Sequence, residues 1–326
     1  ETGRGTFVGP RADSRQASDH DEMRARQTRI QLRIGVIVLW QDAAISDWYS
    51  PGVIRGIDLE ASEHQASVEL LGHTGDKPDL LCRRLEQSRP DVLVCLPGNP
   101  AQAFVVRDAQ RMGIPVVCAG SDYRKFELPT IYEDNVSGMR LAYNHLAELG
   151  HQRISLLLTM QPHPFVFERL AAFRDCCEIN GGFDSGKVHW INTDGAATEI
   201  AGEADRIPRY LERYQPTAVI CGNAVASRVL GLAAHRHRIA IPDALSTVCF
   251  DQSPQMSSWL GVGQPATIAM PLEQIGRELA RTARALHNGE SIELIQLPCE
   301  LVPGESVGAP ATYSTFHNYT MEKDSK

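Results

Sequence analysis

The chain has 326 residues, of which 43% are hydrophobic and 22% are charged, as in soluble globular proteins large enough for two α/β lobes. Its net charge of −8 disfavours a broad surface for nucleic acid or acidic membranes on the folded body. The sequence contains no apolar run of membrane-spanning length, no signal-peptide pattern in residues 1–33 and no CxxC pair among its eight cysteines, so we expect a cytoplasmic protein that does not bind membranes.

Residues 1–33 differ in composition from the rest of the chain. Residues 1–8 are glycine-rich and end on an aromatic and a β-branched residue, a weak pattern of a hairpin edge. Residues 9–33 are polar and rich in Arg, Asp, Ser and Gln, which indicates a linker, in part helical. A polar tail covers residues 307–326.

An alternation of strand and helix patterns begins at residue 34. Short apolar, β-branched runs predict buried strands of a parallel sheet, and amphipathic runs predict helices between them. The expected strands cover residues 34–39, 67–71, 91–96, 115–119, 130–132, 154–158, 188–191, 217–221, 245–250 and 292–301. The expected helices cover residues 51–64, 80–87, 101–112, 136–149, 165–180, 200–214, 224–235 and 272–287, and residues 253–265 form a loop rich in Gly and Ser. This pattern predicts an α/β protein with doubly wound parallel sheets in two lobes and a cleft between them.

Two polar residues follow neighbouring strands of the second half. Asn223 comes after the strand at 217–221 and can cap the next helix, and Asp251 directly follows the strand at 245–250. Because open α/β sheets bind ligands at the carboxyl ends of their strands, both residues are candidates for a ligand site.

Several motifs follow one another in a fixed order between residues 34 and 306. They are IGVIV (34–38), VIRGID (53–58), DVLVCLP (91–97), GIPVVCAG (113–120), EDNVSGMRLAYNHLAELGHQRISLL (133–157), ERLAAFRDC (168–176), PTAVICGNAVASRVL (216–230), IPDALSTVCFDQ (241–252) and ELVPGES (300–306). In this order they resemble the effector-binding module of the LacI/GalR family of transcription regulators, which shares its fold with periplasmic sugar-binding proteins. The run WYSPGVIRGI (48–57) is similar to the arabinose-repressor branch of that family.

The resemblance implies a domain organisation in which the chain crosses between two lobes three times. The N-terminal lobe would cover 34–149 plus 272–289, and the C-terminal lobe 150–271 plus 290–306. In the arabinose-repressor branch the sensor follows a GntR-type winged helix, and GRGTFV (3–8) resembles the end of its wing. The resemblance therefore implies a cytoplasmic repressor that forms a homodimer, binds a sugar-like effector, and contacts operator DNA through a head mostly missing from this chain.

The resemblance also assigns effector contacts in the cleft. Arg169 matches the family's effector-contacting arginine, and its guanidinium suits vicinal hydroxyls or a carboxylate; the alternative is a structural salt bridge with Glu168 or a nearby acid. Asn223 and Asp251 match two more polar positions, against the alternatives of a helix cap and a turn. Trp48 and Tyr49 would stack on a sugar ring, or else form an apolar plug between loop and cleft. The remaining candidates are Gln41, Asp47, Ser137, Phe165 and Gln252.

Three positions depart from the family pattern. Ala224 stands where an Asp is usual, Met270 where Gln or His is common, and Gln252 replaces a second acid. These changes predict a less acidic, more apolar site and leave open a sugar acid, a modified sugar or a non-sugar effector. Because Arg169 would line an open cleft, we expect Arg169→Ala to abolish effector binding without affecting folding.

No pattern indicates catalysis, a cofactor or a metal ion. The chain lacks a Walker loop, HExxH and GxSxG, and His235 and His237 at a helix end do not face one ion. The alternative to a regulator is a periplasmic or extracellular solute-binding protein of a sugar transporter, which would have the same fold.

Overall fold

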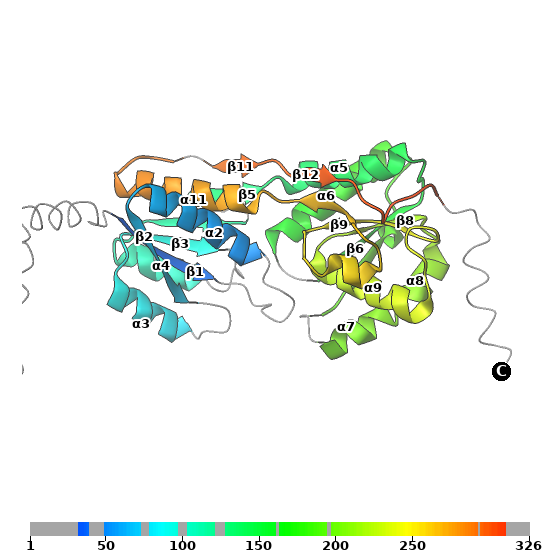
Figure 1. Cartoon of the computed structure of the whole chain (residues 1–326), viewed down its shortest axis with the longest axis horizontal. Coiled ribbons are helices and arrows are strands. Elements are labelled where there is room, and N and C mark those ends of the chain that lie inside the picture. The colour runs from blue at the N-terminus through cyan, green and yellow to red at the C-terminus, as the bar shows by residue number, and fades with distance from the viewer. Residues whose placement is uncertain are drawn as a thin grey trace, which may run out of the picture.

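The computed structural model describes residues 32–38, 49–72, 78–96, 103–120, 128–160, 163–193, 197–292 and 294–310. These residues form two α/β lobes side by side, each built around a six-stranded sheet (Figure 1). The expected winged-helix remnant, nearly all of the linker and most of the polar tail lie outside the described residues. No helix in the described ranges is long and apolar enough to span a membrane.

Both sheets follow the same strand order. The first has the order β11-β5-β4-β3-β1-β2, formed by Ile295–Leu297, Thr130–Glu133, Val116–Ala119, Val92–Leu96, Leu32–Val38 and Ala66–Gly72. The second has the order β12-β10-β9-β8-β6-β7, formed by Glu300–Val302, Ala266–Ala269, Ser246–Phe250, Ala218–Cys221, Ile154–Thr159 and Val188–Ile191. All neighbouring strands are parallel except β10 and β12. The predicted fold class is therefore confirmed.

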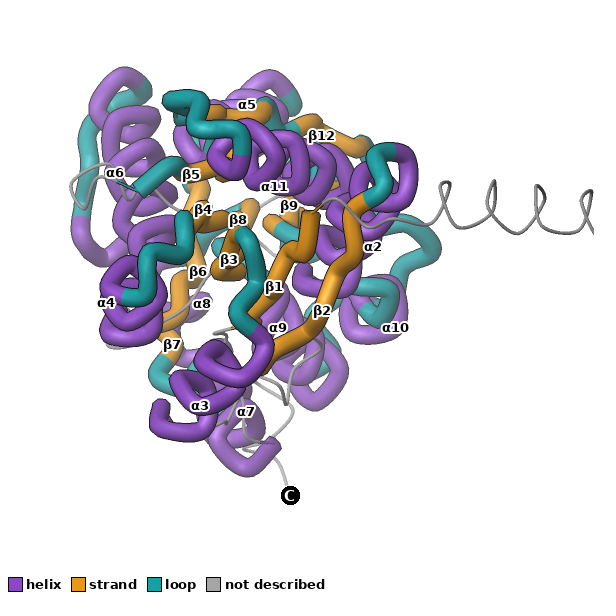
Figure 2. Tube along the Cα trace, turned by 90° about the vertical axis from the view of Figure 1, so that its left-hand side faces the viewer, coloured by secondary structure: helices purple, strands orange, loops and turns teal. Residues whose placement is uncertain are grey.

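Helices cover both faces of the first sheet. They are α2 (Tyr49–Glu63), α3 (Pro78–Ser88), α4 (Ala103–Arg111) and α11 (Leu272–His287). Seen from the end of the first lobe, α2 and α11 lie on one side of the sheet and α3 and α4 on the other (Figure 2). The continuous apolar runs of β1 and β3 are buried because both faces of the sheet are covered.

The second sheet is covered in the same way. Helices α5 (Asn135–Glu148) and α6 (Pro164–Ile179) lie on one face, and α7 (Ala197–Ala204), α8 (Ile207–Tyr214) and α9 (Ala224–His237) lie on the other, next to the short α10 (Met256–Leu260) (Figure 1). A 3₁₀ turn, η4 (Ser185–Lys187), leads into β7. Strands β6, β8 and β9 are parallel neighbours, so their carboxyl ends lie at the same edge of this sheet.

The chain crosses between the lobes three times, at Asp134, at Met270–Pro271 and at Pro298–Cys299. The first and third crossovers are joined by a hydrogen bond from the Asp134 amide to the Leu297 carbonyl (2.8 Å). Two boundaries differ from the expected ones. Helix α5 packs on the second sheet, where a Cβ on Gly138 would meet Ile268 and Phe250, so the first lobe ends near 133 rather than 149. Strand β11 pairs with β5, so residues 295–297 belong to the first lobe.

Four segments differ from the expected secondary structure. The predicted helix at 200–214 is two helices, because Pro208 lies in the first turn of α8 and a new helix begins there. The predicted strand at 292–301 is two strands, β11 and β12, because the chain changes sheets at Pro298. The four-residue strand β10 was not expected, and neither was α10 within the predicted loop.

Helices α2 and α11 approach each other very closely. A Cβ on Gly56 would lie 2.1 Å from the Glu273 carbonyl oxygen, and one on Gly276 would lie 2.0 Å from the Val53 carbonyl oxygen. Only glycine at both positions permits this backbone contact. Beside it, the buried carboxylate of Glu60 accepts hydrogen bonds from Arg277 and Arg281 of α11, which fixes the two helices in register.

Candidate functional site

The carboxyl ends of β6, β8 and β9 bring polar side chains together in the second lobe. Asn223 donates from Nδ2 to Thr159 Oγ1 (2.7 Å), and its Oδ1 accepts the Ala226 amide (2.9 Å), so Asn223 also caps α9. Asp251 accepts the Ala224 amide at Oδ2 (2.7 Å). Its φ of 77° lies in the left-handed region, which Asp tolerates better than most residues. Asn223 and Asp251 therefore lie at the carboxyl ends of neighbouring strands, as predicted.

Arg169 lies at the centre of this region, on the inward face of α6. The helix begins at Pro164, and its buried residues recur every three or four positions, which places Arg169 in the row of Phe165 and Phe173. Arg169 is 2% exposed. Its Nε donates to Asn135 Oδ1 (2.8 Å) and its Nη1 donates to the Gly222 carbonyl oxygen (2.6 Å).

Two carboxyl groups lie near the guanidinium of Arg169, and a third is linked to it through Asn135. Glu133 Oε1 lies 3.9 Å from Arg169 Nη2, and Asp251 Oδ1 lies 3.8 Å from Nη1, both longer than hydrogen bonds. Glu168 Oε2 accepts from Asn135 Nδ2 (2.8 Å), so Asn135 links this third carboxyl to Arg169. Glu133 is 3% exposed, and its Oε2 is buried without a hydrogen-bond partner.

Burial dominates the protonation of these groups. It raises the pKa of Glu133 from 4.5 to about 7, against the attraction of Arg169 and with added repulsion from Glu168 and Asp251. Burial likewise raises the pKa of Asp251, although Arg169 and the Ala224 amide oppose the change. Burial lowers the pKa of the nearby His163, which favours its neutral form.

Two aromatic rings hold the guanidinium in place. The Arg169 carbon Cζ lies 4.7 Å from the centre of the Phe165 ring and 4.1 Å from that of Phe250. His163 stacks on Phe165 with ring centres 5.4 Å apart. Because Phe165 contacts both Arg169 and His163, much of its ring surface is already used within the protein.

The structure brings four of the predicted site residues together: Phe165, Arg169, Asn223 and Asp251. Three other predicted residues have different surroundings. Tyr49 begins α2 and is buried in the first-lobe core, Ser137 is half-buried on α5 with its amide bonded to Asp134, and Gln252 is exposed, with Nε2 3.5 Å from Thr267 Oγ1. Gln41, Asp47 and Trp48 lie outside the described residues.

Sequence reasoning missed Glu133, Asn135 and Thr159, and it read Glu168 only as a salt-bridge partner of Arg169. Glu133 ends β5 and Thr159 ends β6, so the carboxyl-end rule that found Asp251 could have found both. The expectation of a site less acidic than the family pattern stays a prediction, although Glu133 places a carboxyl group 3.9 Å from Arg169. The expectation that Arg169 lines an open cleft is wrong, because its side chain is buried.

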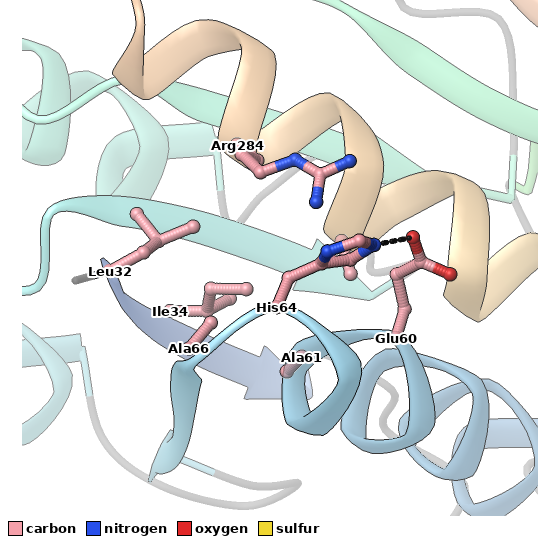
Figure 3. A pocket seen from close by; sticks show the side chains of 8 residues that line it. Leu32, Ile34, Glu60, Ala61, His64, Ala66 and Arg284 are labelled. Carbon is pink, nitrogen blue, oxygen red and sulfur yellow. Dashed lines mark ion pairs between the residues drawn. The ribbon is translucent and has the colours of Figure 1, made fainter. Parts of the chain in front are cut away.

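A small pocket in the first lobe is a separate feature. It lies between β1, α2 and α11, where Glu60, His64 and Arg284 meet apolar residues such as Leu32 and Ile34 (Figure 3). Its volume of about 10 Å³ accommodates one water molecule, which is too little for an effector.

Glu60, Glu63 and His64 place ligand-type atoms within 4.8 Å of one another next to this pocket. Both Glu60 oxygens already accept hydrogen bonds from arginines, and hydrogen bonds from Arg281 and Arg277 outweigh burial and lower the Glu60 pKa. This arrangement is that of an ion-pair network between two helices.

Comparisons with known proteins agree with this architecture. Residues 143–307, just over half of the chain, match the periplasmic binding protein-like domain family. The HTH-type transcriptional repressor CytR of Escherichia coli (strain K12) is 27% identical over 274 residues, which cover 79% of this chain and 75% of the relative.

Solved structures with the same fold include a complex of the transcriptional regulator CelR with cellobiose, at a TM-score of 0.71 and 19% identity, covering 91% of this chain and 92% of that chain. The lac repressor dimer bound to operator and the anti-inducer ONPF gives a TM-score of 0.69 at 18% identity, covering 93% and 100% of the two chains. The chain thus belongs to the periplasmic binding protein-like family, in the form of the effector-binding domain of a LacI/GalR-type transcription regulator.

Proposed function

We propose that this chain is the sensor of a transcriptional repressor and that it binds a sugar or sugar-like molecule between its lobes. One observation carries the proposal. Arg169, from the second lobe, is hydrogen-bonded to Asn135 and faces Glu133, the two residues on either side of the first crossover. A ligand held by Arg169 therefore acts where the lobes are joined.

The remaining groups supply the hydrogen-bonding character of a polyol site. Asn223 and Asp251 offer an amide and a carboxylate at adjacent strand ends, within the same cluster as Arg169. An amide and a carboxylate together can accept from and donate to vicinal hydroxyls. We also propose that Phe165 contacts the ligand. In a closed arrangement of the lobes, the ligand would be contacted in addition by Gln41, Asp47, Trp48, Tyr49, Ser137 and Gln252.

Signal transfer would follow from lobe closure. A ligand that prefers one lobe arrangement shifts the population toward it, and three crossovers restrict this motion to a hinge. We propose that the change reaches operator DNA through residues 9–33 and a winged-helix head, and that two cytoplasmic chains act as a homodimer. Repressor relatives, the cellobiose-bound regulator and the operator-bound dimer support the kind of partners proposed.

The test is thermal unfolding of this chain against pentoses, hexoses, sugar acids and sugar phosphates. A ligand present at 100 times its Kd adds about 2.7 kcal/mol to the free energy of unfolding, a clear rise in Tm. We expect at least one ligand to raise Tm. Asp251→Asn should reduce this ligand-induced rise, and Asp243→Asn in the exposed loop before β9 should leave it unchanged. A panel with no shift would contradict a sugar-sensing role.

A further inference from the structure

Arg169 connects the second lobe to all three crossovers. Its Nε donates to Oδ1 of Asn135, which directly follows the first crossover, at 2.8 Å, and its Nη2 donates to Met270 Sδ, in the second crossover, at 3.6 Å. Cys299, in the third crossover, lies within electrostatic reach: burial raises the pKa of its thiol to about 12, and the charge of Arg169 opposes this rise. A change in how this guanidinium is bound therefore acts on the whole hinge.

The nitrogens of Arg169 are held unequally. Nε and Nη1 donate to oxygen atoms, those of Asn135 and Gly222, at 2.8 and 2.6 Å. Among the described residues, Nη2 donates only to the sulfur of Met270, and a thioether is a weak acceptor. Nη2 is therefore the part of Arg169 that a stronger acceptor can capture.

Glu133 faces Nη2 from the first lobe. It ends β5, its side chain is 3% exposed, and its Oε2 has no hydrogen-bond partner. Its Oε1 lies 3.9 Å from Arg169 Nη2, beyond hydrogen-bond distance. A carboxylate bound to a guanidinium forms hydrogen bonds of about 2.7–2.9 Å that are about twice as strong as neutral ones. Ionisation of Glu133 would thus make it a stronger acceptor for Nη2 than the sulfur of Met270.

The groups around Glu133 make both of its forms accessible near neutral pH. Burial raises its pKa to about 7 against the attraction of Arg169, and the carboxyl groups of Glu168 and Asp251 add to the rise. Cys299 is an uncharged thiol in this range because its pKa is about 12. Glu133 is therefore mostly neutral below pH 7 and mostly ionised above it.

We propose that Glu133 is a proton-controlled latch between the lobes. In its neutral form it leaves Arg169 Nη2 on Met270, as in this structure, and in its ionised form it draws Nη2 onto its carboxylate. The ionised form ties α6 of the second lobe directly to β5 of the first, whereas the neutral form ties α6 to the second crossover. The proton is thus a second input to the hinge, and this role holds whichever effector the sensor binds.

The experiment follows Met270 by NMR in the whole chain without added ligand. The protein carries ¹³C at the methionine methyl groups and at the glutamate carboxyl carbons, and it is titrated between about pH 5 and 9. Met270→Leu and Glu133→Gln identify the two signals by their loss. We expect both signals to shift with one shared midpoint near 7, because Met270 loses its contact with Nη2 as Glu133 ionises. Met256, buried in α10 of the same lobe, should not follow this midpoint.

Substitutions then show whether Glu133 is responsible. Glu133→Gln keeps the shape of the side chain and cannot ionise, so the Met270 signal should remain at its low-pH position throughout the titration. If this variant does not fold, Glu133→Asp identifies the Glu133 signal instead, and the comparison of midpoints in the unsubstituted protein decides the question. Glu178→Gln, at the exposed far end of α6, is the control that should keep the shared midpoint.

Three results would overturn the latch: a Glu133 signal that does not titrate in this range, a Met270 signal that stays constant while Glu133 titrates, and an unchanged Met270 titration in Glu133→Gln. The last result would assign the titration to another group near Arg169. Because the experiment uses no effector, each of these results leaves the sugar-sensing proposal standing, and a flat unfolding panel leaves the latch standing.

Discussion

At the scale of single residues, Arg169 serves two purposes in the same position. Its guanidinium lies between the rings of Phe165 and Phe250 and donates to Asn135 and Gly222, so it is part of the packed interior. It also partly balances the buried Glu133 and Asp251. A residue of this kind contributes to stability as well as to recognition.

We therefore expect Arg169→Ala to lower the free energy of unfolding by about 3–5 kcal/mol, because the substitution leaves buried carboxyl groups without their counter-ion. Arg174→Ala, at an exposed position of the same helix, should change it by no more than about 0.5 kcal/mol. Urea denaturation of both variants measures the difference. Equal stabilities would show that Arg169 is not integrated in the core.

Glu133 should make stability depend on pH. Its folded-state pKa of about 7 is raised above the ordinary 4.5, so the folded protein favours the protonated form. Protonation of Glu133 therefore contributes fully to the free energy of unfolding below about pH 4.5, and this contribution is lost as the pH rises through 7. Urea denaturation between pH 5 and 8 should show a decline that is shallower in Glu133→Gln. Parallel pH profiles of the two proteins would contradict the raised pKa.

At the scale of elements, the contact between α2 and α11 depends on two glycines. Gly56 and Gly276 allow the helix backbones to touch, and the arginines of α11 bind the buried Glu60 of α2 beside them. Because α11 follows the second crossover, this contact fixes a late part of the chain on the first lobe. The glycine pair is thus a structural requirement of the crossover.

Gly56→Ala should destabilise the protein by about 1–3 kcal/mol or more, because the added methyl group collides with the backbone of α11. Gly202→Ala is the matched control: it lies in α7 with open space around its Cβ position. There the loss of glycine should raise stability by about 0.5–1 kcal/mol. Thermal unfolding should give shifts of opposite sign, and two shifts of the same sign would contradict the close contact.

At the scale of the whole molecule, the alternating pattern predicted both lobes and nearly all of their strands. Periodicity describes each element by itself, and so it could not show that the helix at 135–148 packs on the second sheet or that the segment at 292–301 pairs with both sheets. For the same reason, the sequence predicted only part of the candidate site. Asn223, Asp251 and Glu133 all lie at strand ends, but the contact of Glu133 with Arg169, 36 positions later, is a tertiary contact that periodicity does not show.

The three crossovers have a consequence for how such a molecule can be divided. Neither lobe is encoded by one continuous stretch, since the first sheet needs residues 32–133 together with β11, and the second needs β12 as well as residues 154–269. A fragment that ends before α11 would expose the apolar face of α2, including Val53 and Ile57. Recombination at a single point in the gene therefore cannot exchange one lobe for another, and the two lobes must be inherited as a unit.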